Sequence, residues 1–355
     1  MLKCLPPLSP TMPEITPRVS RLRYGVGEDF TAIGALKAGA EALGCKASYP
    51  WLMGIGGAAF RLYWSQDWSL DMANFVTADV VRTAAASVGI EAEAHLNEKP
   101  EDMWELLRRS IDTQSPMLSC GLTSPFETCL IVGYEENPRR LHIRGYLDEG
   151  DAYSQLDFRP WYGWCHQSFG FMPITTLRDG KEPDLPALIR ASLETVLRLA
   201  GEGRIASEFC AIHNTRHVMI SGLDAYIAWA GGISEKPRGD AAHRGFATSL
   251  NMNQLIDART AAQNYLLDLC NRVRPTALLL SRAAEHYAHE VLALKSARQL
   301  IPYPQATPEK AADRLEKLLA DDERRTEYAS LLRTAQNEDS EALGWIRKVV
   351  EGGIL

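Results

Sequence analysis

Glu28, Asp29, Phe30 and Thr31 form a short segment directly before a run of small and aliphatic residues. If that run is a helix, these side chains stand at its positive end, where an attacking thiolate would be stabilised. The Thr31 hydroxyl could attack a carbonyl carbon only with a neighbouring base, and none is evident in the sequence. Phe30 has no lone pair. The segment therefore has the position of a nucleophile without its chemistry.

The carboxylates of Glu28 and Asp29 have two interpretations, and both stay open. They can cap the first turn of the helix, where the helix dipole favours negative charge, or they can contact a ligand there. A carboxylate at position 28 would also oppose the negative charge that develops on a carbonyl oxygen during acyl transfer.

The element that positions this segment is a helix predicted from Thr31 to Leu43. Its aliphatic residues recur at helical spacing, and Gly44 follows where a helix would stop. A second apolar stretch, 51–64, opens after Tyr49-Pro50 and carries three glycines that indicate close backbone packing.

After Pro116 the sequence changes to short apolar runs that favour strands and are punctuated by turn residues. These runs are Met117–Leu122, Cys129–Tyr134, Leu141–Tyr146 and Phe169–Ile174. Asn137-Pro138, between two of them, predicts a hairpin turn. Helices followed by an antiparallel sheet predict an α+β fold.

From about Asp184 the sequence predicts helices almost to its end. The expected helices are Leu185–Ala200, Val218–Ala230, Asn251–Arg272, Ala277–Leu294, Pro308–Ala320 and Asp322–Gln336. We therefore expect an irregular N-terminal arm at 1–20, an α+β domain at 21–180 and a helical subdomain at 181–355.

Composition excludes several classes of protein. The 355 residues are 46% hydrophobic, which is ordinary for a globular chain, and a net charge of -7 gives no general support for nucleic-acid binding. We find no apolar run that could span a membrane and no secretion signal. Seven scattered cysteines without a Cys-x-x-Cys pair predict reduced thiols in the cytoplasm. Gly25-x-Gly27 lacks the third glycine of a dinucleotide motif, so we expect no cofactor.

With these elements laid out, the first 175 positions resemble papain-like bacterial proteins. They are similar to the N-terminal domain family of butirosin biosynthesis protein H, an acyltransferase, and more distantly to bacteriocin-leader peptidases. The resemblance is carried by Glu28–Leu36, Tyr49–Leu62 and Cys129–Tyr134, with a weaker likeness over Leu255–Leu267 and Ala283–Tyr287.

The resemblance implies a papain-like domain with a degenerate catalytic site. In that family a cysteine opens the first helix, and this chain has Phe30 there. The family's histidine would fall at Glu127 or Thr128, Asp148 matches the third catalytic member, and Glu28 falls where the oxyanion-binding glutamine often lies. Attack, proton transfer and oxyanion stabilisation are all compromised, so the chain is expected not to be an enzyme.

The implied function is to bind a small molecule, a peptide or an acyl-carrier partner without cleaving it. The candidate ligand-binding residues are Glu28, Asp29, Thr31, Trp51, Glu127 and Tyr134. Two alternatives stay open. One is an active acyltransferase or amidase that uses Thr31 or Cys129 with Glu127 and Asp148. The other is a structural protein whose cleft is plugged by Phe30 and the proline-rich arm.

A further group of chemical interest, Glu285, His286, His289 and Glu290, falls on one predicted helix. Its residues are one-turn neighbours, which suits surface pairing, and it lacks the His-Glu-x-x-His pattern of a catalytic zinc helix. A di-iron bundle would need a second such group, and the sequence shows none. The sequence therefore predicts no metal site.

Overall fold

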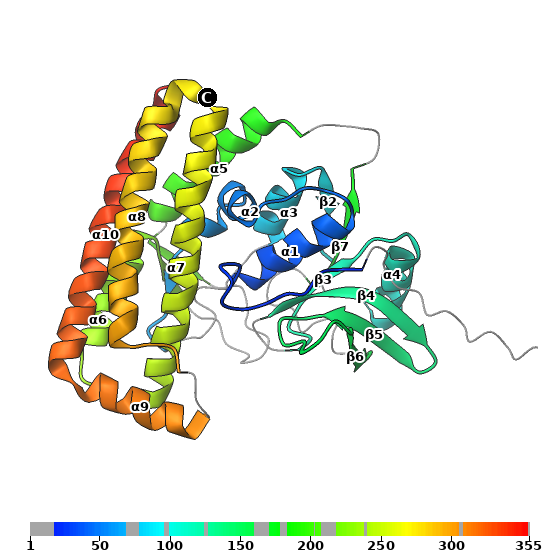
Figure 1. Cartoon of the computed structure of the whole chain (residues 1–355), viewed down its shortest axis with the longest axis horizontal. Coiled ribbons are helices and arrows are strands. Elements are labelled where there is room, and N and C mark those ends of the chain that lie inside the picture. The colour runs from blue at the N-terminus through cyan, green and yellow to red at the C-terminus, as the bar shows by residue number, and fades with distance from the viewer. Residues whose placement is uncertain are drawn as a thin grey trace, which may run out of the picture.

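The computed structural model describes residues 18–68, 78–95, 99–123, 127–159, 170–177, 183–201, 203–206, 218–237, 240–304 and 308–353. It is an α+β structure in which a mixed helix-and-sheet part lies beside long helices (Figure 1). Most of the predicted N-terminal arm, residues 1–17, falls outside the described residues.

The first part of the chain supplies helices first and then an antiparallel sheet. Its helices are α1 (Thr31–Ala42), α2 (Tyr49–Ile55), the 3-10 turn η1 (Ala58–Phe60), α3 (Ala78–Ala86) and α4 (Pro100–Asp112). Its strands are β1 (Tyr63–Trp64), β2 (Ile90–Ala92), β3 (Met117–Cys120), β4 (Thr128–Glu136), β5 (Arg139–Arg144), β6 (Ser154–Asp157) and β7 (Phe171–Thr176).

Helix α1 lies against a six-stranded antiparallel sheet with the order β2-β7-β3-β4-β5-β6. In its central pair Leu118 on β3 is opposite Leu130 on β4. The approach of helix and sheet is close, because a Cβ added at Gly39 would lie 2.4 Å from the Ile174 side chain. Glycine at this position therefore lets α1 settle onto the sheet.

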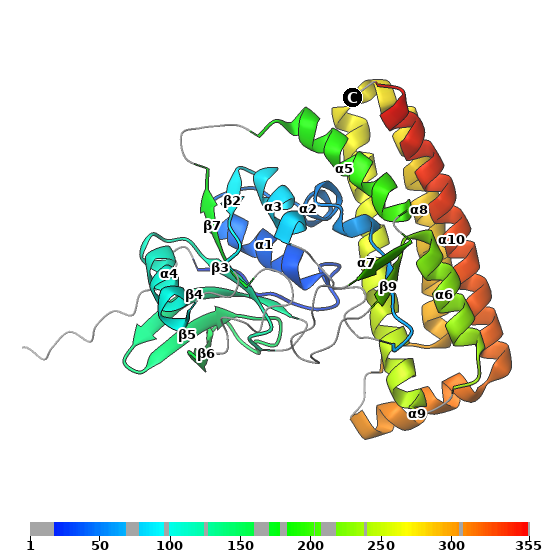
Figure 2. The same cartoon turned by 180° about the vertical axis from the view of Figure 1, so that it is seen from behind.

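The second part is dominated by long helices. These are α5 (Leu185–Gly201), α6 (Leu223–Ser234), α7 (Ala241–Arg272), the 3-10 turn η4 (Arg274–Thr276), α8 (Ala277–Leu300), α9 (Pro308–Ala320) and α10 (Asp322–Glu351). Two short strands, β8 (Arg204–Ala206) and β9 (Val218–Ser221), join β1 in a small sheet ordered β1-β9-β8 beside α6 and α7 (Figure 2).

Among the residues that the structure describes, the buried apolar side chains form two clusters. The first joins α1, α2 and the six-stranded sheet to inward residues of the long helices, including Tyr265 and Tyr287. The second centres on Trp64 and Trp229, whose rings stack at 5.1 Å, together with Tyr328. Helices α7, α8 and α10 contribute to both clusters, so the long helices pack directly against the elements that carry the candidate site.

The predicted elements hold in type, but some helix boundaries differ by several residues. One of them is the end of α8, which lies at Leu300 and not at the predicted Leu294. The helix predicted at Val218–Ala230 is wrong at its start, because residues 218–221 pair in β9. Helix α7 begins ten positions before the predicted Asn251, and α10 continues to Glu351 instead of ending at Gln336. The Asn137-Pro138 turn between β4 and β5 is confirmed.

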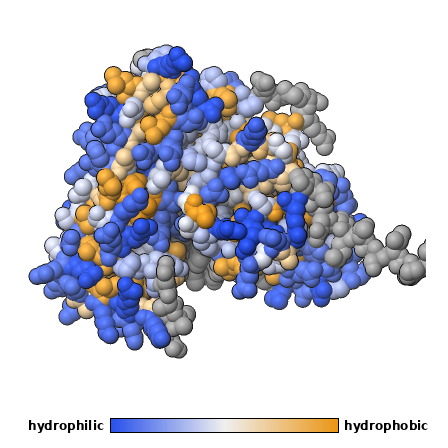
Figure 3. All heavy atoms as spheres, viewed as in Figure 1, coloured by the Kyte–Doolittle hydropathy of each residue, from blue (hydrophilic) through white to orange (hydrophobic). Residues whose placement is uncertain are grey.

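The exposed surface carries only scattered apolar side chains on the face seen in Figure 3, where hydrophobic residues lie in small separate groups among hydrophilic ones. The most exposed large apolar residues are Leu278 and Leu292 on α8. No helix in the described ranges combines the length and the apolar character needed to cross a bilayer.

Candidate functional site

The start of α1 is closed by the side chain of Phe30. Phe30 is the N-cap residue of the helix, and its ring is buried with 3% of its surface exposed. Its carbonyl accepts the amides of Ile33 and Gly34 at 3.1 and 3.0 Å, and its amide donates to the Tyr49 hydroxyl at 2.9 Å. The position that resembles the family's nucleophile therefore holds a packed aromatic ring.

Asp257, from the middle of α7, supplies a carboxylate to the same helix start. The Tyr49 hydroxyl donates to Asp257 Oδ2 at 2.5 Å. Burial raises the pKa of Asp257 to about 6, while hydrogen bonds from Tyr49 and from the amides of Asp29 and Phe30 act in the opposite direction. The Phe30 amide is therefore engaged by the Tyr49 hydroxyl, which is itself held by an acidic side chain.

Tyr146 seals the other side of the helix start. Its hydroxyl donates to the carbonyl of Glu28 at 3.1 Å, and its ring lies 4.8 Å from the ring of Tyr24. A Cβ added at Gly34 would lie 1.9 Å from the Tyr146 hydroxyl, so only glycine leaves room for it. Burial raises the pKa of Tyr146, which keeps the phenol protonated as a donor.

Two residues that the sequence assigned to the candidate site from different elements, Thr31 and Thr128, lie together. The amide of Thr128, the first residue of β4, donates to Thr31 Oγ1 at 3.1 Å. Glu127 precedes it, and its carboxylate is bonded to the Tyr24 hydroxyl at 2.7 Å and to Thr123 Oγ1 at 3.2 Å. The start of α1 therefore faces the start of β4 through two threonines, Thr31 and Thr128.

The interpretation of Glu28 and Asp29 as caps of α1 is wrong, because the helix has no side-chain cap. Asp29 Oδ1 instead accepts the Gly25 amide at 2.6 Å. Glu28 pairs with Lys37, nearly two turns into the helix, at 3.3 Å.

Asp148, which the sequence resemblance suggested as a third catalytic member, is hydrogen-bonded within its own loop. Its Oδ2 accepts from Arg144 Nη1 at 2.9 Å and from the Gly145 amide at 3.1 Å. Its Oδ1 accepts from Ser154 Oγ at 2.6 Å. Arg144 also donates to the carbonyls of neighbouring loop residues. These bonds make Asp148 an organiser of the turn after β5.

Cys129, the thiol of the alternative active-enzyme hypothesis, is fully buried on β4. Burial raises its pKa well above the usual thiol range, with Cys120 and Glu127 acting in the same direction. A protonated thiol without solvent access is a packing residue and not a nucleophile. The structure therefore offers no support for Cys129 as a replacement nucleophile.

The candidate ligand-binding residues divide into three places. Glu28, Asp29, Thr31 and Glu127 lie around the start of α1. Tyr134, near the far end of β4, bonds to Asp112 on α4 at 2.9 Å and does not join them. Trp51 on α2 lies toward the opposite end of α1, where it lines a pocket.

That pocket is open to the surface and has a volume of about 650 Å³. Its lining residues come from the end of α1, the start of α2, the end of α3 and the long helices; they are Glu41, Gly44, Cys45, Lys46, Ala47, Ser48, Trp51, Ser87, Val88, Leu185 and Arg272. The Arg272 guanidinium lies 4.3 Å from the Trp51 ring centre, and the Trp51 indole donates to Ser87 at 3.0 Å. The pocket thus combines a flat aromatic wall with cationic and hydroxyl groups.

Sequence reasoning missed Tyr49, Tyr146 and Asp257 as residues that close the helix start. Asp257 carried a usable signal, because it is an acidic residue inside the apolar run that follows Leu255 in a long predicted helix. Buried acidic residues in such runs require partners, and that requirement could have marked it as a contact residue.

Comparison with models of known protein families and with curated protein sequences finds no match to this chain.

Proposed function

We propose that this chain is a non-hydrolytic binding protein, built on a papain-like domain that has lost its acyl-transfer groups. The observation that carries the proposal is the closed start of α1, where Phe30 fills the nucleophile position. The Tyr49 hydroxyl accepts the Phe30 amide there and donates in turn to the Asp257 carboxylate. The facing of Thr31 and Thr128 supports the papain-like interpretation, because it pairs the helix and strand positions that this family uses.

Acyl transfer at this site would be opposed at each step. Attack requires a thiolate or an activated hydroxyl, and the position holds a benzyl ring. A tetrahedral intermediate requires free donors for its oxygen, whereas Asp257 would place negative charge beside the developing oxyanion. The benzyl ring at the nucleophile position and the carboxylate near the oxyanion position therefore both disfavour acyl transfer.

The pocket at the other end of α1 is the best-supported place for a ligand. Its volume of about 650 Å³ suits a small molecule or the end of a peptide. Lys46 and Arg272 favour an anionic group such as a carboxylate or a phosphate, and the Trp51 ring favours a flat apolar group beside it. We propose a small anionic ligand with an aromatic or unsaturated part. A peptide terminus or the acyl group of a carrier protein would use the same groups.

Native mass spectrometry of protein purified from cells tests this binding. We expect a co-purified mass that is lost in a variant carrying Lys46→Ala and Arg272→Ala. A matched variant carrying Lys236→Ala and Arg282→Ala removes two cations outside the pocket and should keep the bound mass. Equal retention by both variants would place the ligand elsewhere and contradict the pocket assignment.

The loss of acyl transfer is tested separately with thioester and peptide substrates and with iodoacetamide. We expect no turnover above the uncatalysed rate and no labelling that is coupled to turnover. Turnover that is abolished by Thr31→Ala or Cys129→Ala, with the fold intact, would overturn the proposal in favour of the active-enzyme alternative.

A further inference from the structure

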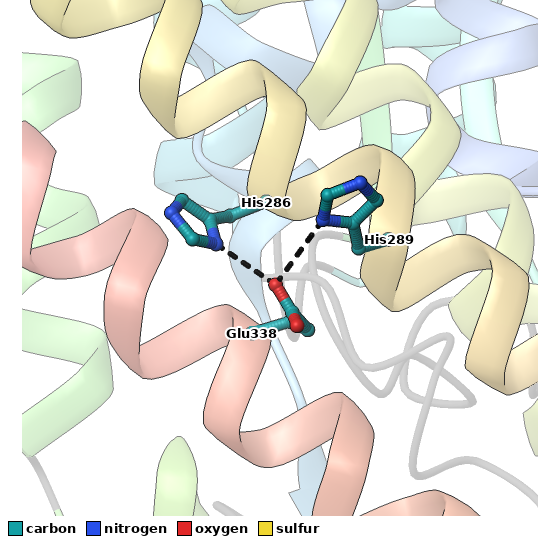
Figure 4. A group of neighbouring side chains, drawn as sticks. All are labelled: His286, His289 and Glu338. Atoms are coloured by element: carbon teal, nitrogen blue, oxygen red, sulfur yellow. Dashed lines mark hydrogen bonds and ion pairs between the residues drawn. The ribbon is translucent and has the colours of Figure 1, made fainter.

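Two histidines of α8 and one glutamate of α10 converge between the long helices. His286 and His289 are one turn apart on the same face of α8, and both rings point toward Glu338 (Figure 4). Glu338 Oε2 lies 2.8 Å from His286 Nδ1 and 3.7 Å from His289 Nδ1. One ligand atom from each residue falls within 4.8 Å of the others, which is close enough for one metal ion to reach all three.

We propose that His286, His289 and Glu338 form a binding site for a single divalent transition-metal ion of the zinc class. Imidazole nitrogens with one carboxylate oxygen are ligands that Zn²⁺ takes in proteins, and they suit it better than Mg²⁺ or Ca²⁺, which prefer oxygen. The ion would displace the proton of the hydrogen bond between His286 Nδ1 and Glu338 Oε2. It would also be coordinated by His289.

The buried residues behind the three side chains hold them in register. Tyr287 follows His286 and Asp339 follows Glu338, and the Tyr287 hydroxyl donates to Asp339 Oδ1 at 3.0 Å. Asp339 is bound in turn by Arg259 Nη2 at 2.9 Å. These contacts hold α8 against α10 through the residues that directly follow His286 and Glu338. The metal-binding side chains therefore face each other before any ion binds.

Solvent access agrees with binding of an ion from solution. The side chain of His289 is 54% exposed, and those of His286 and Glu338 are 25% and 27% exposed. Three protein ligands leave at least one coordination position of Zn²⁺ for water or for a group from another molecule. The site therefore has the open form seen in reactive or ligand-accepting metal centres.

Of the four residues that the sequence grouped on this helix, only the two histidines belong to the proposed site. Glu285 pairs with Arg282 at 2.8 Å, and Glu290 is buried on the inner side of α8 against Arg259. The third ligand comes from α10, 52 positions away from His286. A search for two or more ligands along one helix could not find it, which explains why the sequence predicted no metal.

The test uses the full chain, freed of metal with a chelator and titrated with Zn²⁺ in isothermal calorimetry. We expect one ion per chain, and at least about a tenfold loss of affinity in each of His286→Ala, His289→Ala and Glu338→Gln. Mutation of a residue that only supports a metal ligand lowers metal affinity or activity by about 10–100-fold. Loss of a ligand itself should therefore lower the affinity at least as much. Glu327→Gln, an exposed change on the same helix α10, should bind as the unmodified chain does.

Co²⁺ substitution provides a second readout, because its visible absorption reports imidazole and carboxylate coordination directly. Circular dichroism of each variant confirms that the helices persist, as expected for partly exposed side chains. Zn²⁺ binding that is unchanged in the variant lacking all three ligands, or no binding to the unmodified chain at micromolar Zn²⁺, would overturn the proposal.

Discussion

The Tyr49 hydroxyl donates a 2.5 Å hydrogen bond to Asp257 Oδ2, and this bond joins the start of α2 to the middle of α7 across 208 positions of sequence. Through Tyr49 and Asp257 the long helices reach the amides at the start of α1. The helical part of the chain therefore helps to close the start of α1. This relationship gives the binding hypothesis its physical basis.

Asp257 predicts an unusual pH dependence of stability. Its folded-state pKa is about 6, against 3.8 for an unperturbed aspartate, because burial disfavours its charge. Its stabilising contribution is thus complete below about pH 4 and is lost as pH rises through about 6. The difference of two pKa units corresponds to about 3 kcal/mol. We expect Asp257→Asn to remove this decline when urea unfolding is measured from about pH 4 to about pH 8.

The control is Asp313→Asn, an exposed aspartate on α9, which should leave the pH profile unchanged. Asp29 lies near enough to raise the pKa of Asp257, so Asp29→Asn should move the midpoint of the decline to lower pH. Parallel profiles for the unmodified chain and Asp257→Asn would contradict the assignment of this carboxyl.

Gly34→Ala tests the closure by Tyr146. The new Cβ would lie 1.9 Å from the Tyr146 hydroxyl and 3.2 Å from the Glu28 carbonyl oxygen, so the phenol must move and lose its hydrogen bond. We expect a loss of about 1–3 kcal/mol in the free energy of unfolding. Tyr146→Phe removes the hydroxyl oxygen that lies closest to the new Cβ. In that background, Gly34→Ala should lower the free energy of unfolding by at least about 0.5 kcal/mol less than it does in the unmodified chain.

Gly231→Ala is the matched control, because it changes a helical glycine that has nothing within 4 Å of a new Cβ. Alanine is the better helix former, so this variant should gain about 0.5–1 kcal/mol. If Gly34→Ala were equally harmless, the packing of Tyr146 against α1 would be wrong.

The sequence was sufficient to predict elements that local patterns define. Helix α1 followed from aliphatic spacing and a terminal glycine, and β3, β4 and β5 followed from short apolar runs bounded by turn residues. Strand β9 was missed because its four residues run almost directly into α6, so one apolar stretch contains two elements. Its pairing partner β1 lies far away in sequence and leaves no local signal.

The candidate site was predictable only in part for the same reason. The sequence grouped Thr31 with Glu127 as candidate ligand-binding residues, and the amide of the neighbouring Thr128 donates to Thr31 Oγ1. The residues that close the helix start, Tyr146 and Asp257, act through tertiary contacts that no spacing rule encodes. The expected caps failed because Asp29 accepts the Gly25 amide and Glu28 pairs with Lys37 instead.

Cys129 should resist alkylation in the native protein. Iodoacetamide reacts with the thiolate, and burial both excludes the reagent and raises the pKa of this thiol. We expect peptide mapping to show labelling of the half-buried Cys45 and Cys270 first, with Cys129 labelled only at the rate of global unfolding. Native labelling of Cys129 ahead of Cys45 would revive the hypothesis of a relocated nucleophile.

Arg259 is the group whose removal should destabilise the long helices most. Its guanidinium is buried and bonds to Glu290 at 2.9 Å, to Asp339 at 2.9 Å and to the carbonyl of Ala59 at 2.8 Å. Arg259→Met leaves two buried carboxyl groups without their cation, and we expect a loss of about 3–5 kcal/mol in urea unfolding. Arg282→Met breaks an exposed pair with Glu285 and should cost less than about 1 kcal/mol.

The loss caused by Arg259→Met should also depend on pH. Burial raises the pKa of Glu290 to about 8 even though Arg259 acts against this shift, so removing the arginine makes protonation of Glu290 easier still. The variant should therefore lose less stability at about pH 6 than at about pH 8. Adding Glu290→Gln to Arg259→Met should recover part of the loss at the higher pH, because the charge that lacks a partner is gone. Equal losses for Arg259→Met and Arg282→Met would show that the buried network does not hold α8 and α10 together, and the preset register of His286 and Glu338 would lose its support.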